Sequence, residues 1–143
     1  MIKSKVSVLL VDDFGPFRAL VSSLLRGKPE LQIVAEVSDG LAAVERARQL
    51  LPDVILLDIG LPILNGIEAA RQIRELGLQS KIIFVTQENS AEAVQEAILL
   101  GASAYVVKAM AGSELLKAID LVLQGKQFIG TGLAARDHNG SRE

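Results

Sequence analysis

Four apolar runs in this chain each end at a polar residue with useful chemistry. The runs are three or four residues long and rich in Val, Ile and Leu, a pattern typical of parallel strands that helices bury on both faces. The carboxyl ends of parallel strands lie along one edge of a sheet, where open α/β folds bind their ligands. The runs are residues 8–11 before Asp12 and Asp13, 54–57 before Asp58, 82–85 before Thr86, and 105–107 before Lys108.

Segments with helical periodicity separate these runs. Phe17, Val21 and Leu24 lie at spacings of three and four and predict a helix over residues 14–26. The remaining predicted elements are a strand over 31–37, a helix that starts at 38–40, a helix containing Ile67 and Ile73, a helix opened by a capping box of Asn89 and Glu92, and a last helix capped by Gly125. Together they make five β-α units.

This strict alternation predicts a three-layer α/β fold with right-handed crossovers. Five strands match a flavodoxin-like parallel sheet of order 2-1-3-4-5 with five helices, whose switch point lies between strands one and three. Asp12, Asp13 and Asp58 end those two strands. Pattern and topology therefore select the same place for a binding site.

The chain is expected to form one domain over residues 1–127. Its 143 residues, 50% of them hydrophobic, are enough for one sizeable core. After Gln127 the periodicity fails, and residues 128–143 are predicted to be a flexible, Gly-rich tail or the start of a linker to an output domain that this chain lacks.

Composition excludes several classes of function. A net charge of -2 without a basic stripe argues against direct nucleic-acid contact or attraction to an anionic membrane. The absence of cysteine excludes disulfides, thiolate catalysis and zinc-thiolate sites. Residues 1–5 lead directly into the first strand, and no apolar run reaches spanning length, so we expect no secretory signal, no membrane span and a cytoplasmic protein.

The three carboxylates predict a magnesium site. Close carboxylates repel each other by roughly 4 kcal/mol per pair at an effective dielectric of 20, and Mg²⁺ is a hard cation that a few carboxylate oxygens and water satisfy. Asp58 stands alone at its strand end, with Gly60 allowing close backbone approach, and is the expected nucleophile for a phosphoryl group. Lys108 and Thr86 would stabilise the phosphoryl oxygens.

Each of these residues also has a structural interpretation when taken singly. Asp12 or Asp13 is suited to cap the following helix, and Lys108 to form a structural ion pair with Asp58. Coincidence of all of them at the ends of four strands favours a functional site.

The same residues resemble the receiver domains of two-component response regulators, in particular the NarL/LuxR-type subfamily. The resemblance runs from about Lys5 to Gly125. Its motifs are Val11-Asp12-Asp13, Asp58-Ile59-Gly60-Leu61-Pro62, Asn65-Gly66, Thr86, Gly101 to Lys108, and Gly112-Ser113-Glu114-Leu115-Leu116.

The resemblance implies a role for each site residue. Mg²⁺ would be held by Asp12, Asp13, Asp58 and the backbone carbonyl of Gly60, and Asp58 would take a phosphoryl group from a histidine kinase or phosphotransfer protein. Lys108 and Thr86 would contact that group, and Tyr105 would move with Thr86 as a switch. Such a chain is a signalling phosphoacceptor rather than an enzyme, with self-phosphorylation and self-dephosphorylation at most, and phosphorylation is expected to favour a homodimer and to control a transcriptional output domain.

Three departures and three alternatives accompany the resemblance. Phe14 makes the mouth of the site apolar, Gln87 narrows it, and Ala109 stands where many receivers have proline. Phe14 also argues against a haloacid-dehalogenase-type phosphatase, which carries Asp at that position. Because the acidic pair is not a Gly-rich loop, a nucleotide or flavin binder is disfavoured. A phosphorylation-independent interaction module with a receiver fold stays open.

Overall fold

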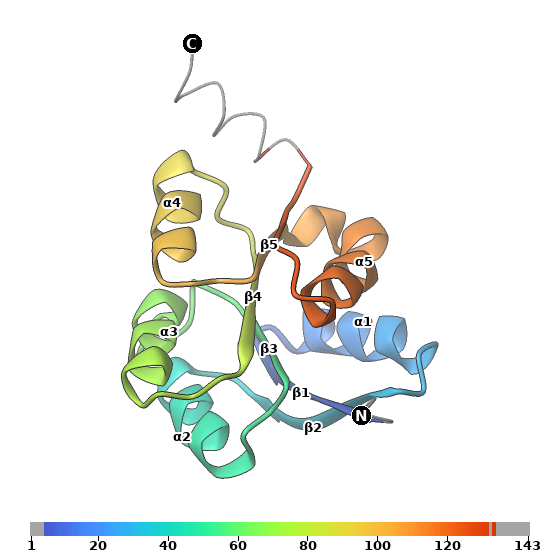
Figure 1. The fold of residues 1–143 in the computed structure, drawn as a ribbon, viewed down its shortest axis with the longest axis horizontal. Helices are drawn as coiled ribbons and strands as arrows, with labels where there is room; N and C mark the ends of the chain where they lie inside the picture. Colours follow the sequence, from blue (N-terminus) through green and yellow to red (C-terminus); the bar gives the residue numbers. More distant parts are fainter. Residues whose placement is uncertain (1–4, 132, 134–143) are drawn as a thin grey trace.

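A central parallel sheet lies between two layers of helices in the computed structural model, which describes residues 5–131 and 133 (Figure 1). The strands are ordered β2-β1-β3-β4-β5-β6, and the predicted flavodoxin-like three-layer fold is confirmed. The strands are β1 (Val6–Val11), β2 (Leu31–Val37), β3 (Val54–Leu57), β4 (Lys81–Thr86), β5 (Ala104–Val107) and β6 (Phe128–Ile129). The helices are α1 (Gly15–Arg26), α2 (Gly40–Leu50), α3 (Gly66–Glu75), α4 (Ala91–Leu99), α5 (Ala111–Leu123) and the short 3-10 helix η1 (Lys108–Met110).

Each face of the sheet has its own hydrophobic core. Side chains alternate across a strand, so neighbouring residues such as Leu56 and Leu57 enter opposite layers. The helices α1 and α5 cover one face, and α2, α3 and α4 cover the other (Figure 1). All four residues of β3 are buried, as expected for a strand covered on both sides.

The strand register aligns the ends that carry the polar residues. Leu57 pairs with Val11 of β1 and with Phe84 of β4, and Thr86 pairs with Val107 of β5. The residues that follow these pairs therefore emerge at the same edge of the sheet. This register is the reason that four distant parts of the sequence meet in one place.

Three helices begin at polar caps, one of which differs from the sequence prediction. Asp39 and Asn65 accept hydrogen bonds from the main-chain N–H groups of Ala42 and Glu68. Helix α4 is capped by Ser90 instead of the predicted Asn89, because it is the Ser90 hydroxyl that accepts the N–H three residues on.

The sheet has a sixth, two-residue strand beyond the five predicted, and it lies in the stretch assigned to the tail. Phe128 and Ile129 pair in parallel with Ala104 and Tyr105 of β5, and Leu133 is buried. A two-residue strand is too short to show alternation and is followed by a Gly-rich stretch, which hid it from the sequence analysis. Residues 132 and 134–143, also assigned to the tail, lie outside the described residues.

Within the described part of the chain no helix has both the length and the apolar character needed to cross a membrane.

Candidate functional site

An acidic cluster lies at the carboxyl ends of β1 and β3. Asp12, Asp13 and Asp58 each offer a carboxylate oxygen, and these oxygens lie within 4.8 Å of one another. Asp12 and Asp58 are buried, whereas Asp13 is exposed. The sheet therefore brings together the three carboxylates predicted from the sequence, with one side open to solvent.

Lys108 joins the cluster from the end of β5. Its Nζ lies 2.8 Å from Asp12 Oδ2 and 3.1 Å from Asp58 Oδ2. The same ammonium lies 4.7 Å from the centre of the Phe17 ring on α1, a cation-π contact. Burial alone would lower the pKa of Lys108, but its hydrogen bonds with Asp12 and Asp58 and their charges outweigh burial, and its pKa is raised. Lys108 is therefore a fixed cation between two carboxylates.

Both oxygens of the Asp12 side chain are already engaged. Oδ2 contacts Lys108, and Oδ1 accepts the N–H of Phe14 at 2.9 Å. Its main-chain carbonyl accepts a hydrogen bond from Arg18 of α1 at 2.7 Å. Burial raises the pKa of Asp12, and the charge of Asp58 adds to this effect despite the opposing hydrogen bonds from Lys108 and Phe14.

The loop between β3 and α3 leaves one side of Asp58 less engaged. Asp58 Oδ2 contacts Lys108, but among the described residues Oδ1 accepts a single hydrogen bond, a long one of 3.4 Å from the N–H of Gly60. Gly66 at the start of α3 packs directly under this loop, where a Cβ would lie 1.9 Å from the carbonyl oxygen of Asp58. Its N–H donates to the carbonyl of Ile59 at 2.8 Å. Gly66 thus allows α3 to approach the loop that carries Asp58 closely.

Thr86 and Tyr105 both bind Glu88, the residue that links them. The Thr86 hydroxyl oxygen accepts the N–H of Glu88 at 3.3 Å, and the Tyr105 hydroxyl donates to the carbonyl of Glu88 at 2.7 Å. Tyr105 is fully buried, with its ring centre 6.1 Å from that of Phe84. Burial raises the pKa of Tyr105, and the charges of Glu88 and Asp58 raise it further, so the hydroxyl keeps its proton.

We expect Tyr105→Phe to lower the free energy of unfolding by about 1 kcal/mol, because a buried hydrogen bond is lost and the Glu88 carbonyl loses its donor. Urea unfolding followed by circular dichroism should show a lower midpoint with an unchanged slope. Equal midpoints for the two proteins would mean that this hydrogen bond contributes nothing in solution.

Sequence reasoning missed the supporting residues of the site. Phe17 and Arg18 were considered only as parts of a helix, and Glu88 was not considered at all. The Arg18 side chain donates to the main-chain carbonyl of Asp12, and Glu88 binds Thr86 through its own main-chain N–H. Main-chain groups are the same in every residue, so such contacts leave no pattern in a sequence. The position of Phe17, one turn after Asp13 in a predicted helix, was the one available signal.

An open hollow of about 770 Å³ borders the site on the side of α1. Phe14, which is 59% exposed, and Leu20 give it an apolar wall, as expected for the site mouth. Gln87 lies on its rim together with Asp13 and Lys108. The hollow thus leads from an apolar surface to the charged groups.

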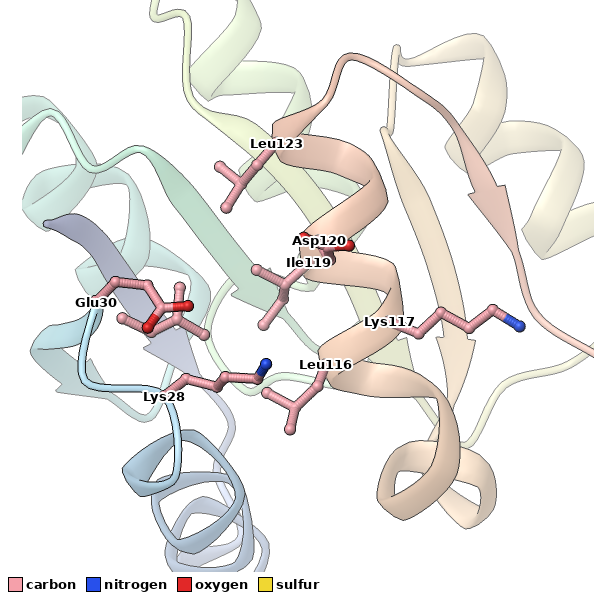
Figure 2. A pocket seen from close by; sticks show the side chains of 8 residues that line it. Lys28, Glu30, Leu116, Lys117, Ile119, Asp120 and Leu123 are labelled. Atoms are coloured by element: carbon pink, nitrogen blue, oxygen red, sulfur yellow. The ribbon is translucent and has the colours of Figure 1, made fainter. Parts of the chain in front are cut away.

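A second hollow, of about 350 Å³, lies between α5 and the segment that leads into β2 (Figure 2). Leu116, Ile119 and Leu123 of α5 face Lys28 and Glu30, which precede β2. It contains none of the acidic cluster, so the chemistry of the carboxylates and this surface are separate features.

Fold and site together define a parallel α/β domain with an acidic, lysine-containing site at the carboxyl ends of its strands, and comparison with known proteins identifies its family. The chain matches the response regulator receiver domain over residues 8–120. It is 35% identical over 127 residues to the nitrate/nitrite response regulator protein NarL of Escherichia coli (strain K12), covering 89% of this chain and 59% of NarL. It is 34% identical to the transcriptional regulatory protein DegU of Brevibacillus brevis, covering 89% of this chain and 54% of DegU.

Solved structures agree. A two-component response regulator of the LuxR family from Aurantimonas sp. SI85-9A1 superposes with a TM-score of 0.92 at 31% identity, covering 98% of this chain and all of that one. The receiver domain of the putative response regulator NarL from Mycobacterium tuberculosis gives a TM-score of 0.81 at 30% identity, covering 86% of this chain and 99% of that one. The chain therefore belongs to the response regulator receiver domain family, and its relatives are of the NarL/LuxR type. It spans between half and two thirds of the length of its first curated relatives.

Proposed function

We propose that Asp58 is the phosphoacceptor of a two-component signalling pathway in the cytoplasm. A carboxylate oxygen of Asp58 attacks the phosphorus of a phosphohistidine on a histidine kinase or phosphotransfer protein. A P–O bond forms while the P–N bond breaks, and the imidazole leaves as the phosphoryl group moves to Asp58. The chain is thus a phosphorylated signalling partner and not an enzyme in its own right.

The observation that carries this assignment is the difference in hydrogen bonding among the three carboxylates. Both oxygens of Asp12 are held at 2.9 Å or less, whereas Asp58 Oδ1 has one long hydrogen bond within the part of the chain that the structure describes. Asp13 is exposed and makes no contact with Lys108 in the part of the chain described. Asp58 alone combines burial, a neighbouring cation and a lightly engaged oxygen, which is the combination a nucleophile needs.

The donor set also fits Mg²⁺. Three carboxylates against one ammonium leave an excess of two negative charges, and the oxygens lie close enough to share one ion. Asp13 and Asp58 would hold the ion with the carbonyl of Gly60, and Asp12 would contribute mainly through water. When bound, Mg²⁺ neutralises charge and orients phosphoryl oxygens for in-line transfer.

Incubation with acetyl phosphate tests the proposed function. We expect one phosphoryl group per chain by intact-mass measurement in the presence of Mg²⁺, and none when the ion is chelated. A chain that binds neither Mg²⁺ nor beryllofluoride and never incorporates phosphate would instead be the phosphorylation-independent interaction module.

Asp13→Asn is expected to lower the affinity for Mg²⁺ at least tenfold, because it removes the most accessible anionic oxygen of the cluster. Isothermal titration calorimetry on both proteins measures the change. Asp120→Asn is the matched control, since this carboxylate is exposed on α5 and pairs with Gln124. Equal affinity in wild type and Asp13→Asn would contradict the proposed ligand set.

Signal output is proposed to pass through Thr86 and Tyr105. A phosphoryl oxygen on Asp58 would bind the hydroxyl of Thr86, and Tyr105 would respond through Glu88. Such a ligand shifts a pre-existing equilibrium only by its difference in affinity for the two states. The shift would favour a homodimer and, in a longer protein, control a DNA-binding output domain joined through the linker that begins after β6. No direct nucleic-acid contact by the described residues is proposed.

A further inference from the structure

The chain that follows α5 returns to the free edge of the sheet, beside the proposed switch residue. Ile129 pairs with Tyr105, and the N–H of Gly130 donates to the Tyr105 carbonyl at 2.9 Å. In Figure 1 this segment runs along β5 between α5 and α4. We define residues 128–131 and Leu133 as the return segment.

A buried carboxylate fastens the return segment to α5. Glu114 is only 5% exposed, and its Oε2 accepts hydrogen bonds from both the N–H and the hydroxyl of Thr131. Its Oε1 has no hydrogen-bond partner among the described residues. Because burying a carboxylate costs free energy unless it is bonded, the two hydrogen bonds from Thr131 favour the docked position of the segment.

Close packing also restricts the return segment to this position. A Cβ on Gly130 would lie 2.8 Å from Glu114 Oε1 and 3.1 Å from the Tyr105 carbonyl oxygen. Leu133 is buried in the same hydrophobic cluster as Tyr105, on the side of the sheet that α4 covers. The segment therefore touches Tyr105 through its main chain and shares a core with its ring.

Three hydrogen bonds, joined through the covalent structure of Glu88 and Tyr105, lead from Thr86 to this segment. The Thr86 hydroxyl accepts the Glu88 N–H, which leaves its own hydrogen free to donate to a phosphoryl oxygen. The Glu88 carbonyl accepts the Tyr105 hydroxyl, and the Tyr105 carbonyl accepts the Gly130 N–H. A displacement of Glu88 or Tyr105 would therefore reach Gly130 through the covalent structure of these two residues.

We propose that the β5 edge is an intramolecular docking surface for the return segment and that phosphorylation of Asp58 strengthens this docking. The inference rests on the proposed function, because it requires a phosphoryl group at Asp58. Coupling between two sites is reciprocal, so the docked segment must also raise the affinity for the phosphoryl group. The phosphorylation state of Asp58 would thereby change how firmly the return segment is held on β5.

Amide hydrogen exchange in the full chain tests the coupling. With Mg²⁺ and beryllofluoride, the amides of Gly130 and Thr131 should exchange at least fivefold more slowly than without them, after correction for global stabilisation. The amide of Leu56 in β3, a buried strand paired on both sides at the centre of the sheet, provides that correction. Reciprocally, Gly130→Ala should weaken beryllofluoride binding by a similar factor.

Matched variants separate an effect on docking of the return segment from a general loss of stability. Gly112→Ala lies in α5 with nothing within 4 Å of the added Cβ and should bind beryllofluoride like wild type. Thr131→Val removes only the hydroxyl bond to Glu114 and should act in the same direction as Gly130→Ala, but more weakly. Binding of beryllofluoride without a change in exchange at Gly130 and Thr131 would overturn the coupling and leave the proposed function intact. Failure of wild type to bind beryllofluoride would overturn both.

Discussion

Asp58→Asn abolishes incorporation of a phosphoryl group from acetyl phosphate, and this is the largest effect on activity that we expect. The amide nitrogen and oxygen of Asn cannot form the acyl phosphate, and neither neighbouring carboxylate is placed to substitute. Asp12 has both oxygens engaged by Lys108 and Phe14, and Asp13 lies exposed at the mouth of the site. Intact-mass measurement after incubation with Mg²⁺ and acetyl phosphate checks this result.

Two control variants separate loss of the nucleophile from general effects of replacing an acidic residue. Asp120→Asn, on the surface of α5, should be phosphorylated to the same extent as wild type. Asp13→Asn keeps the nucleophile and should be phosphorylated more slowly, with the rate rising at higher Mg²⁺ concentration. Full phosphorylation of Asp58→Asn would move the acceptor to another residue and remove the basis of the proposed function.

Gly66→Ala is expected to have the largest effect on stability, lowering the free energy of unfolding by about 3 kcal/mol or more, within the upper range of single substitutions. The added Cβ would lie 1.9 Å from the Asp58 carbonyl oxygen and 2.8 Å from Ile59 Cα, so the backbone of the loop after β3 or of α3 must move. Urea unfolding measures the loss, and the same displacement should weaken beryllofluoride binding in the protein that remains folded.

Gly60→Ala is the matched control for stability. It lies in the same loop, but nothing lies within 4 Å of its added Cβ, and its φ is not positive. We expect a change within about 0.5 kcal/mol, as for substitutions that create no clash. Similar losses for Gly60→Ala and Gly66→Ala would show that loop flexibility, rather than close approach, decides the effect.

The sequence predicts well the site residues that follow strands, and poorly the residues whose contacts involve main-chain groups. Asp58, Thr86 and Lys108 follow apolar runs, and the rule that parallel strands end at one edge places them together, as the register confirms. Arg18 and Glu88 support the same site through carbonyls and amides, for which side-chain patterns give no signal.

The strand β6 and its contacts could not be predicted from the sequence either. The strand β6 has two residues, and the contacts that hold it come from Glu114, which the sequence presents only as one acidic residue in a helix. Its burial depends on a partner, Thr131, in a stretch whose Gly content predicts a loop. Only the three-dimensional arrangement shows that these residues belong together.

The register that aligns the strand ends also has a consequence for the order of events during synthesis. The two buried carboxylates come from the first half of the chain, whereas Lys108, the cation between them, is among the last residues of the sheet to be made. Contacts between such distant residues form late in folding, because the intervening chain must first be ordered. A ribosome-bound chain that ends before β5 therefore has uncompensated carboxylates and no complete acceptor site. If Asp58 is the phosphoacceptor, as proposed, its phosphorylation would require a chain in which β5 has already joined the sheet.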